Sequence, residues 1–330
     1  MRVFITGSTG FLGDHVSRML TSQGVDIVRL VRTPDMSDMS DMSDTSVVCN
    51  SVEDFDPVNS CVKVVDAVVH LAGLVHHTHD PRLVSDMRRV NVRGTMAMMK
   101  AARHWGCPII CASTSGVSAC FESSNASVGD ASTPYATNTI EHMPYYLTKL
   151  DAERSAISYA DTHDIDLRVV RFPTLIGPGE RGLRSNRVLD SFRRGSYPCY
   201  LNVGLSFVDV RDVARTMTEL CISAIDGLGV SETRDRITIV STTNCTMVQC
   251  AQRLKAVAHI PPLPWFTLPT WIARVAMWTM DALRLSGFGS ITPMNLRMGT
   301  LWWWVQGNVE TKYSLEDSYK AFVRRFGGSS

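Results

Sequence analysis

A glycine-rich turn near the start of the chain restricts its possible folds more than any other feature. Glycines stand at positions 7, 10 and 13, in the run Thr6–Gly13 (TGSTGFLG). This run follows a short β-branched and aromatic stretch, Arg2–Ile5, and opens a stretch of helical spacing, Phe11–Ser22. Glycine permits a tight turn and lets backbone N–H groups approach a pyrophosphate, whose charge a helix N-terminus favours. The turn therefore predicts a dinucleotide site formed by Gly7, Thr9, Gly10, Phe11, Leu12 and Gly13.

Strand-like and helix-like segments alternate along the N-terminal half. Further apolar strands are expected at Val25–Val31, Val64–Leu71, Pro108–Ser113 and Asp166–Phe172, and long helices at Met87–His104 and Pro144–Asp161. Strands separated by helices of this length form right-handed βαβ crossovers and a parallel sheet covered on both faces. The predicted fold class is therefore α/β, a Rossmann doubly wound parallel sheet with a smaller C-terminal substrate-binding lid.

The pattern changes after Pro173, where glycine and proline cluster and shorter, aromatic-rich elements follow. We expect a dinucleotide-binding domain over 1–174, to which 206–240 return, and a lid built from 175–205 and 241–330. Between Pro34 and Thr45 the triplet Asp-Met-Ser is repeated, which predicts a low-complexity surface loop.

Charge and cysteine content exclude several classes of partner. The chain has 33 Lys and Arg against 32 Asp and Glu, so its net charge of +1 gives no field to hold nucleic acid. Cysteines without a CxxC pair indicate free thiols in a reducing, cytoplasmic setting. The apolar stretch Trp265–Leu285 is interrupted by Pro269, Arg274, Asp281 and Arg284, so no transmembrane segment is expected. A helix lying on a membrane surface is the alternative to a buried one.

Tyr145 and Lys149 are the candidate proton-transfer pair. Both lie in the predicted helix Pro144–Asp161, where a spacing of four places the two side chains on one face. A nearby cation favours the phenolate, so we expect Lys149 to lower the pKa of Tyr145 toward a useful acid/base value. The end of an upstream strand, Ser113-Thr114-Ser115, supplies hydroxyl groups for the same site.

Several motifs follow one another in a characteristic order. They are Thr6–Gly13, Asp66–Gly73 (DAVVHLAG), Asn91–Thr95 (NVRGT), Ala112–Val117 (ASTSGV), Tyr145–Lys149 (YYLTK), Arg171–Gly179 (RFPTLIGPG) and Phe207–Ala214 (FVDVRDVA). In this order they resemble the extended short-chain dehydrogenase/reductase superfamily, of the NAD-dependent epimerase/dehydratase type. Within it the chain is similar to the branch of dihydroflavonol reductase and 3β-hydroxysteroid dehydrogenase.

The resemblance implies roles for individual residues. Tyr145 would be the general acid/base at the substrate oxygen, Lys149 would bond the nicotinamide ribose, and Thr114 would hydrogen-bond the reacting oxygen, with Ser113 and Ser115 as alternatives. Further cofactor contacts would be Leu71, Ala72, Gly73, Asn91 and Pro173, Asn91 being more often structural in this branch. Candidate substrate contacts are Ser115, His76 and Thr174. A homodimer formed through the helices that contain Asn91 and Tyr145 is also implied.

The end of the second strand indicates which dinucleotide is bound. NAD enzymes place an acidic residue there for the ribose 2′-hydroxyl, whereas this chain has Arg32, which can pair a 2′-phosphate. We therefore expect NADP(H) rather than NAD(H), with a solvated Arg32 as the alternative. Ser51 stands where the family usually has an adenine-contacting Asp, and it is taken as the residue at that cofactor position.

The expected reaction interconverts a ketone or aldehyde and a secondary alcohol on a hydrophobic or aromatic small molecule. The family's nucleotide-sugar enzymes hold a diphosphate with an Asn where this chain has Thr174, and with an Arg where it has Leu205-Ser206. The tryptophans between Trp265 and Trp304 suit an apolar pocket, with ordinary core as the alternative.

Two other functions stay open. An NAD-dependent nucleotide-sugar epimerase or dehydratase would need phosphate contacts from another loop, for which the candidates are Arg181, Arg184, Arg187, Arg193 and Arg194. A catalytically silent dinucleotide-binding regulator would keep the fold without the chemistry, although the presence of Tyr145 and Lys149 argues against it. The loop His76-His77-Thr78-His79 is interpreted as solvated or substrate-facing, and no metal site is expected.

Overall fold

The computed structural model describes residues 1–32, 45–122, 128–180, 185–197, 199–228, 236–258, 260–261, 266–283, 285 and 292–326. The chain forms two compact units. The first comprises Met1–Thr114, Pro144–Arg171 and Arg211–Ile239, and the second comprises Ser115–Met143, Phe172–Val210 and Val240–Ser330. The repeated Asp-Met-Ser triplets lie outside the described residues.

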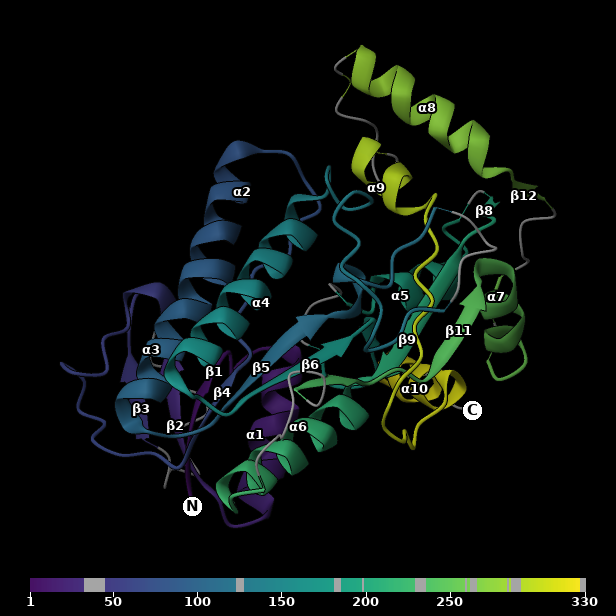
Figure 1. Ribbon diagram of the computed structural model, residues 1–330. Coiled ribbons are helices and arrows are strands. Elements are labelled where there is room, and N and C mark those ends of the chain that lie inside the picture. The colour runs from purple at the N-terminus through teal and green to yellow at the C-terminus, as the bar shows by residue number, and fades with distance from the viewer. Residues whose placement is uncertain are drawn as a thin grey trace. The chain divides into compact units, whose positions relative to one another are not determined.

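A seven-stranded sheet forms the centre of the first unit (Figure 1). In spatial order its strands are β10 (Ile237–Ile239), β6 (Leu167–Phe172), β5 (Ile109–Thr114), β4 (Ala67–His70), β1 (Arg2–Thr6), β2 (Asp26–Val31) and β3 (Thr45–Val48). β1 pairs in parallel with β2 on one side and with β4 on the other. The strand order therefore reverses between β1 and β4, the place at which open α/β sheets bind their ligands. The predicted doubly wound parallel sheet is confirmed.

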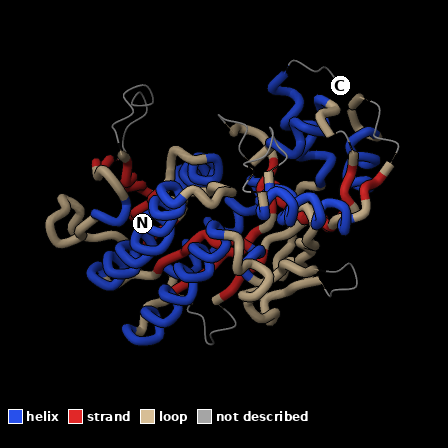
Figure 2. The backbone as a smooth tube through the Cα atoms, turned by 90° about the horizontal axis from the view of Figure 1, so that it is seen from above, coloured by secondary structure: helices blue, strands red, loops and turns tan. Residues whose placement is uncertain are grey.

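Helices cover both faces of this sheet (Figure 1). α1 (Phe11–Ser22) and α6 (Val210–Ile225) lie on one face, and α3 (Gly94–Trp105) and α4 (Pro144–His163) lie on the other. Figure 2 shows helices running alongside the strands when the molecule is seen from above. The core between α3, α4 and the sheet buries Phe4, Val68, Met98 and Ala156. Burying an apolar side chain as large as Phe or Met stabilises a fold by about 1.5–3 kcal/mol.

The helix expected over Met87–His104 is longer and less regular than predicted. It begins as α2 (Pro81–Met87), where the Asp80 carboxylate accepts a hydrogen bond from the Arg82 N–H at 2.9 Å. A π-helical turn, η3 (Arg88–Arg93), then joins α2 to α3. Such a turn accommodates an extra residue in a helix and is frequent at functional sites. Here it contains Asn91.

The central sheet differs from the predicted one in three places, one of which is β10, a strand of three residues that is not among the expected strands. β3 was not predicted, because a strand of four residues carries little periodic signal. β4 is shorter than the predicted Val64–Leu71, since Val64 is exposed and the buried run covers only Ala67–His70. A short 3-10 turn, η2 (Val52–Asp54), follows β3.

The second unit consists of short strands and helices. A three-stranded sheet has the order β11 (Thr243–Thr246), β9 (Gly204–Asp209) and β7 (Thr174–Ile176), and β12 (Thr267–Leu268) pairs with β8 (Tyr200–Leu201). The described helices are η4 (Ser115–Val117), α5 (Arg187–Arg194), α7 (Met247–Lys255), α8 (Thr270–Ala282), α9 (Pro293–Met298), α10 (Leu315–Val323) and η5 (Arg324–Phe326). Their core is rich in aromatic side chains, among them Phe192, Phe207, Tyr319 and Phe322.

The boundaries of the second unit differ from the predicted ones. It contains the predicted lid segments 175–205 and 241–330 together with Ser115–Met143 and Phe172–Thr174, which the sequence pattern assigns to the first domain. The chain returns to the first unit at Arg211 rather than at 206, because β9 pairs with β7 and β11 and not with the central sheet. That the second unit binds the substrate stays a prediction.

The described tryptophans do not form one apolar cluster. Trp302 and Trp304 pack edge to face with ring centroids 4.8 Å apart, and a Cβ at Gly204 would collide with both rings. Trp271 and Trp278 on α8 are 64% and 75% exposed. Trp265 lies outside the described residues. The tryptophans are therefore divided between core and surface within the second unit, and they give no support to the predicted apolar pocket.

Helix α8 is apolar on two sides. Ala273 and Met277 are buried, whereas Trp271, Val275 and Trp278 are exposed along an opposite stripe. At 13 residues α8 is too short to cross a bilayer. Within the part of the chain that the structure describes, no helix has both the length and the apolar character needed to cross a membrane.

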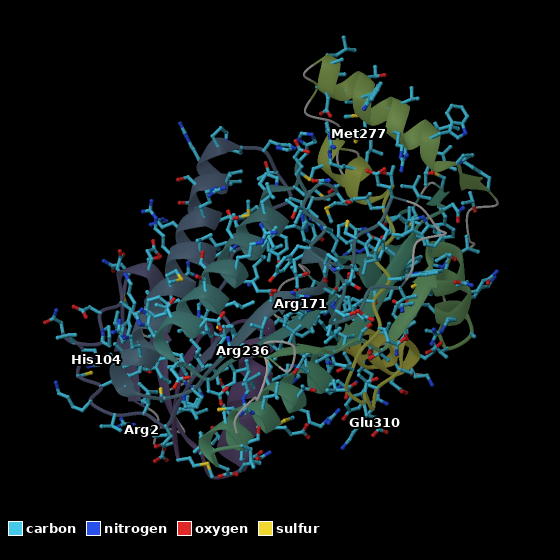
Figure 3. All side chains as sticks on the ribbon, viewed as in Figure 1. Arg2, His104, Arg171, Arg236, Met277 and Glu310 are labelled. Atoms are coloured by element: carbon cyan, nitrogen blue, oxygen red, sulfur yellow. The ribbon has the colours of Figure 1, made fainter. Side chains whose placement is uncertain are left out.

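A buried ion pair attaches α4 to two strands of the first unit. Arg171 Nε donates to Glu153 Oε1 and Oε2 at 3.1 and 3.3 Å, and its Nη2 also bonds Oε1. Ser113 Oγ donates to Glu153 Oε2 at 2.6 Å. Both charged side chains are 2% exposed, and Figure 3 shows Arg171 surrounded by other side chains. The pair holds the helix that carries Tyr145 and Lys149 against β5 and β6.

We expect Glu153→Gln to lower the free energy of unfolding by about 3–5 kcal/mol, because it removes the charge of the carboxylate that pairs with the buried Arg171 guanidinium. Urea unfolding measures the change. Glu219→Gln on α6 is the matched control, since it breaks a more exposed pair with Arg215 and is expected to cost less than about 1 kcal/mol. Equal losses in the two variants would contradict the stabilising role of the buried pair.

Candidate active site

The three glycines of the first turn allow backbone segments to touch. Gly7 has φ +71°, in the region that side chains disfavour, and a Cβ there would lie 2.7 Å from Ala72 N. A Cβ on Gly13 would overlap the Gly7 carbonyl oxygen. Gly10 N donates to Gly7 O at 3.0 Å. The turn, the start of α1 and the loop after β4 are therefore in direct contact.

The start of α1 fits a pyrophosphate. Its N-cap residue, Gly10, provides no side-chain cap, and the first N–H to bond within the helix is that of Asp14, at 2.9 Å from Gly10 O. The preceding N–H groups and the positive end of the helix dipole suit an anion. The hydroxyl of Ser8 is buried and has no partner among the described residues. The uncapped helix start thus has the donors that a pyrophosphate needs, and cofactor binding by residues 7–13 stays a prediction.

Asn91 holds the loop that follows β4. Its Oδ1 accepts the Leu74 N–H at 2.8 Å, and its Nδ2 donates to Leu74 O at 2.9 Å and to Thr148 Oγ1 at 3.0 Å. Both amide hydrogens are thus engaged within the protein. Asn91 therefore positions the loop that carries the predicted cofactor residues Leu71, Ala72 and Gly73, and it joins that loop to α4.

Lys149 reaches the strand that ends on Thr114. Its Nζ donates to the Ala112 carbonyl oxygen at 2.8 Å, and Ala112 and Thr114 both belong to β5. Burial lowers the pKa of Lys149, and this effect is opposed by Cys111 and Glu153. Thr114 is half-buried at the carboxyl end of its strand. The structure thus brings Lys149 and the predicted hydroxyl residue to the same strand end.

The acidity of Tyr145 differs from the prediction. Burial raises the pKa of Tyr145 to about 12, whereas we expected Lys149 to lower it. The expected lowering is wrong for this arrangement, because the Lys149 ammonium bonds the Ala112 carbonyl while desolvation penalises the phenolate. At neutral pH the Tyr145 phenol therefore holds its proton, which is the form that can donate to a carbonyl oxygen.

His77, which sequence reasoning treated only as part of a His-rich loop, packs on Tyr145. The two rings meet edge to face with centroids 5.7 Å apart, and the His77 ring also stacks on Tyr146 at 6.2 Å. Tyr145 and Tyr146 contact each other at 5.0 Å. His77 is the member of this loop with ring contacts to Tyr145, whereas the predicted substrate residue was its neighbour, His76. The doubled histidine was the only sequence signal for such a contact.

Two predicted cofactor residues lie at the other strand ends. Arg32 is exposed just after β2. Ser51 precedes η2, and its hydroxyl donates to the Glu53 carboxylate, which also pairs with Arg89 at 3.2 Å. A carboxylate therefore does lie beside the predicted adenine position, but it comes from Glu53, two residues later than expected.

Three predicted residues belong to the second unit. Ser115 is buried and begins η4, Pro173 lies between β6 and β7, and Thr174 is exposed at the start of β7. Their contacts with cofactor and substrate stay predictions.

Two of the five arginines that could bind the diphosphate of a nucleotide sugar form ion pairs with an acidic side chain. Arg193 and Arg194 pair with Asp190 at 2.6 and 2.8 Å. Arg187 is exposed on α5, and Arg181 and Arg184 lie outside the described residues.

The chain is similar to known proteins of one family. The model of the NAD dependent epimerase/dehydratase family matches residues 3–223, more than half of the chain. A putative dihydroflavonol 4-reductase of Synechocystis sp. is 25% identical over 281 residues, 84% of this chain and 78% of the relative. A dTDP-glucose 4,6-dehydratase of Streptomyces antibioticus is 28% identical over 189 residues, 54% of each chain.

A solved structure extends the similarity of fold to the whole chain. MoeE5 in complex with UDP-glucuronic acid and NAD superposes with a TM-score of 0.71 at 21% identity, covering 99% of both chains. The family match, the parallel sheet and the glycine turn agree with the motifs of the extended short-chain dehydrogenase/reductase superfamily. The chain belongs to the NAD-dependent epimerase/dehydratase family of that superfamily and is an NAD(P)-dependent enzyme.

Proposed function

We propose that the enzyme uses NADP(H) to interconvert a ketone or aldehyde and a secondary alcohol on a hydrophobic or aromatic small molecule. The observation that carries the proposal is the position of Tyr145 on α4, the helix that also brings Lys149 to β5. A protonated phenol is the form that the reductive direction requires.

The residues of the first unit have separate tasks in this reaction. When bound, the nicotinamide supplies or accepts the hydride at the substrate carbon. Tyr145 gives its proton to the carbonyl oxygen during reduction and takes it back during oxidation. Thr114 hydrogen-bonds the same oxygen and orients it. Preorganised donors of this kind stabilise the charge that develops on the oxygen in the transition state.

The substrate class rests on what the matching positions do not offer to a diphosphate. Thr174 stands in place of the amide, and Leu205 and Ser206 in place of the cation. Ser206 Oγ bonds Ser241 Oγ at 3.0 Å within the second unit. These points favour a substrate without a diphosphate over a nucleotide sugar.

Replacing the Tyr145 phenol tests the proposal. We expect Tyr145→Phe to reduce turnover by about 10²–10⁴-fold, since it removes the proton donor, while the dissociation constant for NADPH stays unchanged. Turnover is followed by NADPH absorbance with a panel of hydrophobic ketones, and binding by calorimetry. Tyr159→Phe is the matched control, because Tyr159 lies near the C-terminal end of the same helix, about four turns from Tyr145. Full activity of Tyr145→Phe would refute the assignment.

The same panel separates the alternative functions. A nucleotide-sugar enzyme would turn over UDP- or dTDP-sugars and leave the ketones unchanged. A silent regulator would bind dinucleotide and turn over neither.

Arg32 is expected to select the cofactor. We expect kcat/KM to be higher with NADPH than with NADH, and Arg32→Ser to lower the NADPH value by about 10- to 100-fold, because a charged hydrogen bond to the 2′-phosphate is lost. The NADH value should stay nearly constant. Arg18→Ser on α1, where the side chain is also exposed, controls for surface charge. An NADH preference in the unaltered enzyme would contradict this prediction.

The ring of His77 is expected to hold Tyr145 in place. We expect His77→Ala to lower kcat by about two- to tenfold, the equivalent of one edge-to-face contact, whereas His77→Phe should keep most of the activity. Steady-state kinetics with a ketone found in the panel measure both. If kcat falls as much in His77→Phe as in His77→Ala, the imidazole nitrogens rather than the packing of the ring support turnover, and the prediction is wrong.

A further inference from the structure

His70 is a buried titratable residue that the reaction does not use. It is the last residue of β4 and is 3% exposed. Burial, assisted by the positive charge of Lys149, lowers the pKa of His70 to about 3, so the imidazole is neutral at physiological pH. A neutral imidazole has one N–H donor and one acceptor nitrogen, and its neighbours determine which nitrogen is which.

The neighbours of His70 allow one arrangement of protons. Thr95 Oγ1 lies 2.6 Å from the Asn91 carbonyl oxygen, which can only accept, so the single Thr95 hydroxyl hydrogen points there. His70 Nε2 lies 3.1 Å from the same Oγ1, and it must therefore carry the proton and donate. His70 Nδ1 is then an acceptor, and it receives the hydroxyl hydrogen of Thr6 at 2.7 Å.

The Thr6 hydroxyl oxygen has lone pairs left for two backbone donors. The N–H groups of Leu71 and Ala72 both donate to it, each at 3.2 Å. Thr6 directly precedes Gly7, and Gly7 touches the same Leu71–Ala72 peptide, as the Cβ distance of 2.7 Å from Ala72 N shows. The acceptor nitrogen of His70 thus orients the hydroxyl that fastens the glycine turn to the end of β4.

The donor side of His70 leads toward the helix of the active site. Thr95 bonds the backbone of Asn91, and the Asn91 amide holds Leu74 and Thr148. Thr148 in turn donates to the Tyr145 carbonyl oxygen at 2.7 Å. A directed series of hydrogen bonds therefore runs from the glycine turn to Tyr145, beside which the nicotinamide is expected.

We propose that His70, as its Nε2–H tautomer, is a positioning residue for the dinucleotide, acting through Thr6 on the spacing between the glycine turn and residues 71–72. The proposal rests on dinucleotide binding by the family and is independent of the ketone substrate proposed above. The Nδ1 side of the ring then affects NADPH binding, whereas the Nε2 side affects the stability of the fold.

Four substitutions separate the two sides. His70→Asn keeps an acceptor near the Nδ1 position, whereas His70→Gln keeps a donor near the Nε2 position and loses the acceptor. Thr6→Val removes the hydroxyl on the cofactor side. Thr218→Val is the matched control, because Thr218 is a fully buried residue of α6 whose hydroxyl has no partner among the described residues.

The readout is the dissociation constant for NADPH alone, measured by calorimetry without substrate, beside the urea midpoint. We expect Thr6→Val and His70→Gln to weaken NADPH binding roughly tenfold, because backbone donors at the turn lose their acceptor or its orientation. For His70→Asn and Thr218→Val, the dissociation constant for NADPH should stay within about threefold of the value for the unaltered enzyme, a change that corresponds to a single weak hydrogen bond. Affinity losses that follow the stability losses across all variants would overturn the proposal.

A spectroscopic test does not depend on any variant folding. In the unaltered protein labelled with ¹⁵N-histidine, the His70 resonance should show a protonated Nε2 and an unprotonated Nδ1 at neutral pH. A proton on Nδ1 would overturn the assigned direction of the hydrogen bonds. If His70→Gln does not fold, Thr6→Val and this spectrum still decide the question, and neither involves a carbonyl substrate.

Discussion

The contact between two stretches of backbone at the glycine turn is the constraint on which the rest of the first unit depends. Gly7 touches the Leu71–Ala72 peptide just after β4, and Gly13 touches the carbonyl of Gly7, at distances that any side chain would prevent. The same contacts leave the start of α1 without a cap and its N–H groups available for an anion. The close backbone packing and the proposed cofactor site therefore depend on the same glycines.

Buried polar groups then place α4, the helix of the proposed proton donor, with respect to the turn. Glu153 and Arg171 hold α4 on β5 and β6, and Asn91 connects it to the loop after β4. A buried polar group is stable only when its partners are present, so alternative positions of the helix would leave these groups unsatisfied. The hydrogen bonds add specificity to an apolar interface that would tolerate small shifts.

Much of this arrangement could be predicted because it depends on local pattern. The alternation of strands and helices predicts the parallel sheet, and the order of motifs locates Tyr145, Lys149 and the glycine turn. What could not be predicted depends on distant residues. The raised pKa of Tyr145 follows from burial, and the ring contact of His77 follows from the path of a loop without periodicity. His70 belongs to the motif Asp66–Gly73, but the role proposed for it depends on the strand register that places it beside Thr6 on β1.

The spacing of these contacts along the chain has a consequence for folding. Thr6 and His70 are 64 positions apart, and Asn91 and Thr148 are 57 apart. Closing such long loops costs entropy before the contacts form, so pairings of this kind tend to appear late and to slow the search for the native state. Helix α4 formed on its own would therefore still lack the contacts that Thr148 and Lys149 make beside Tyr145 in the folded protein.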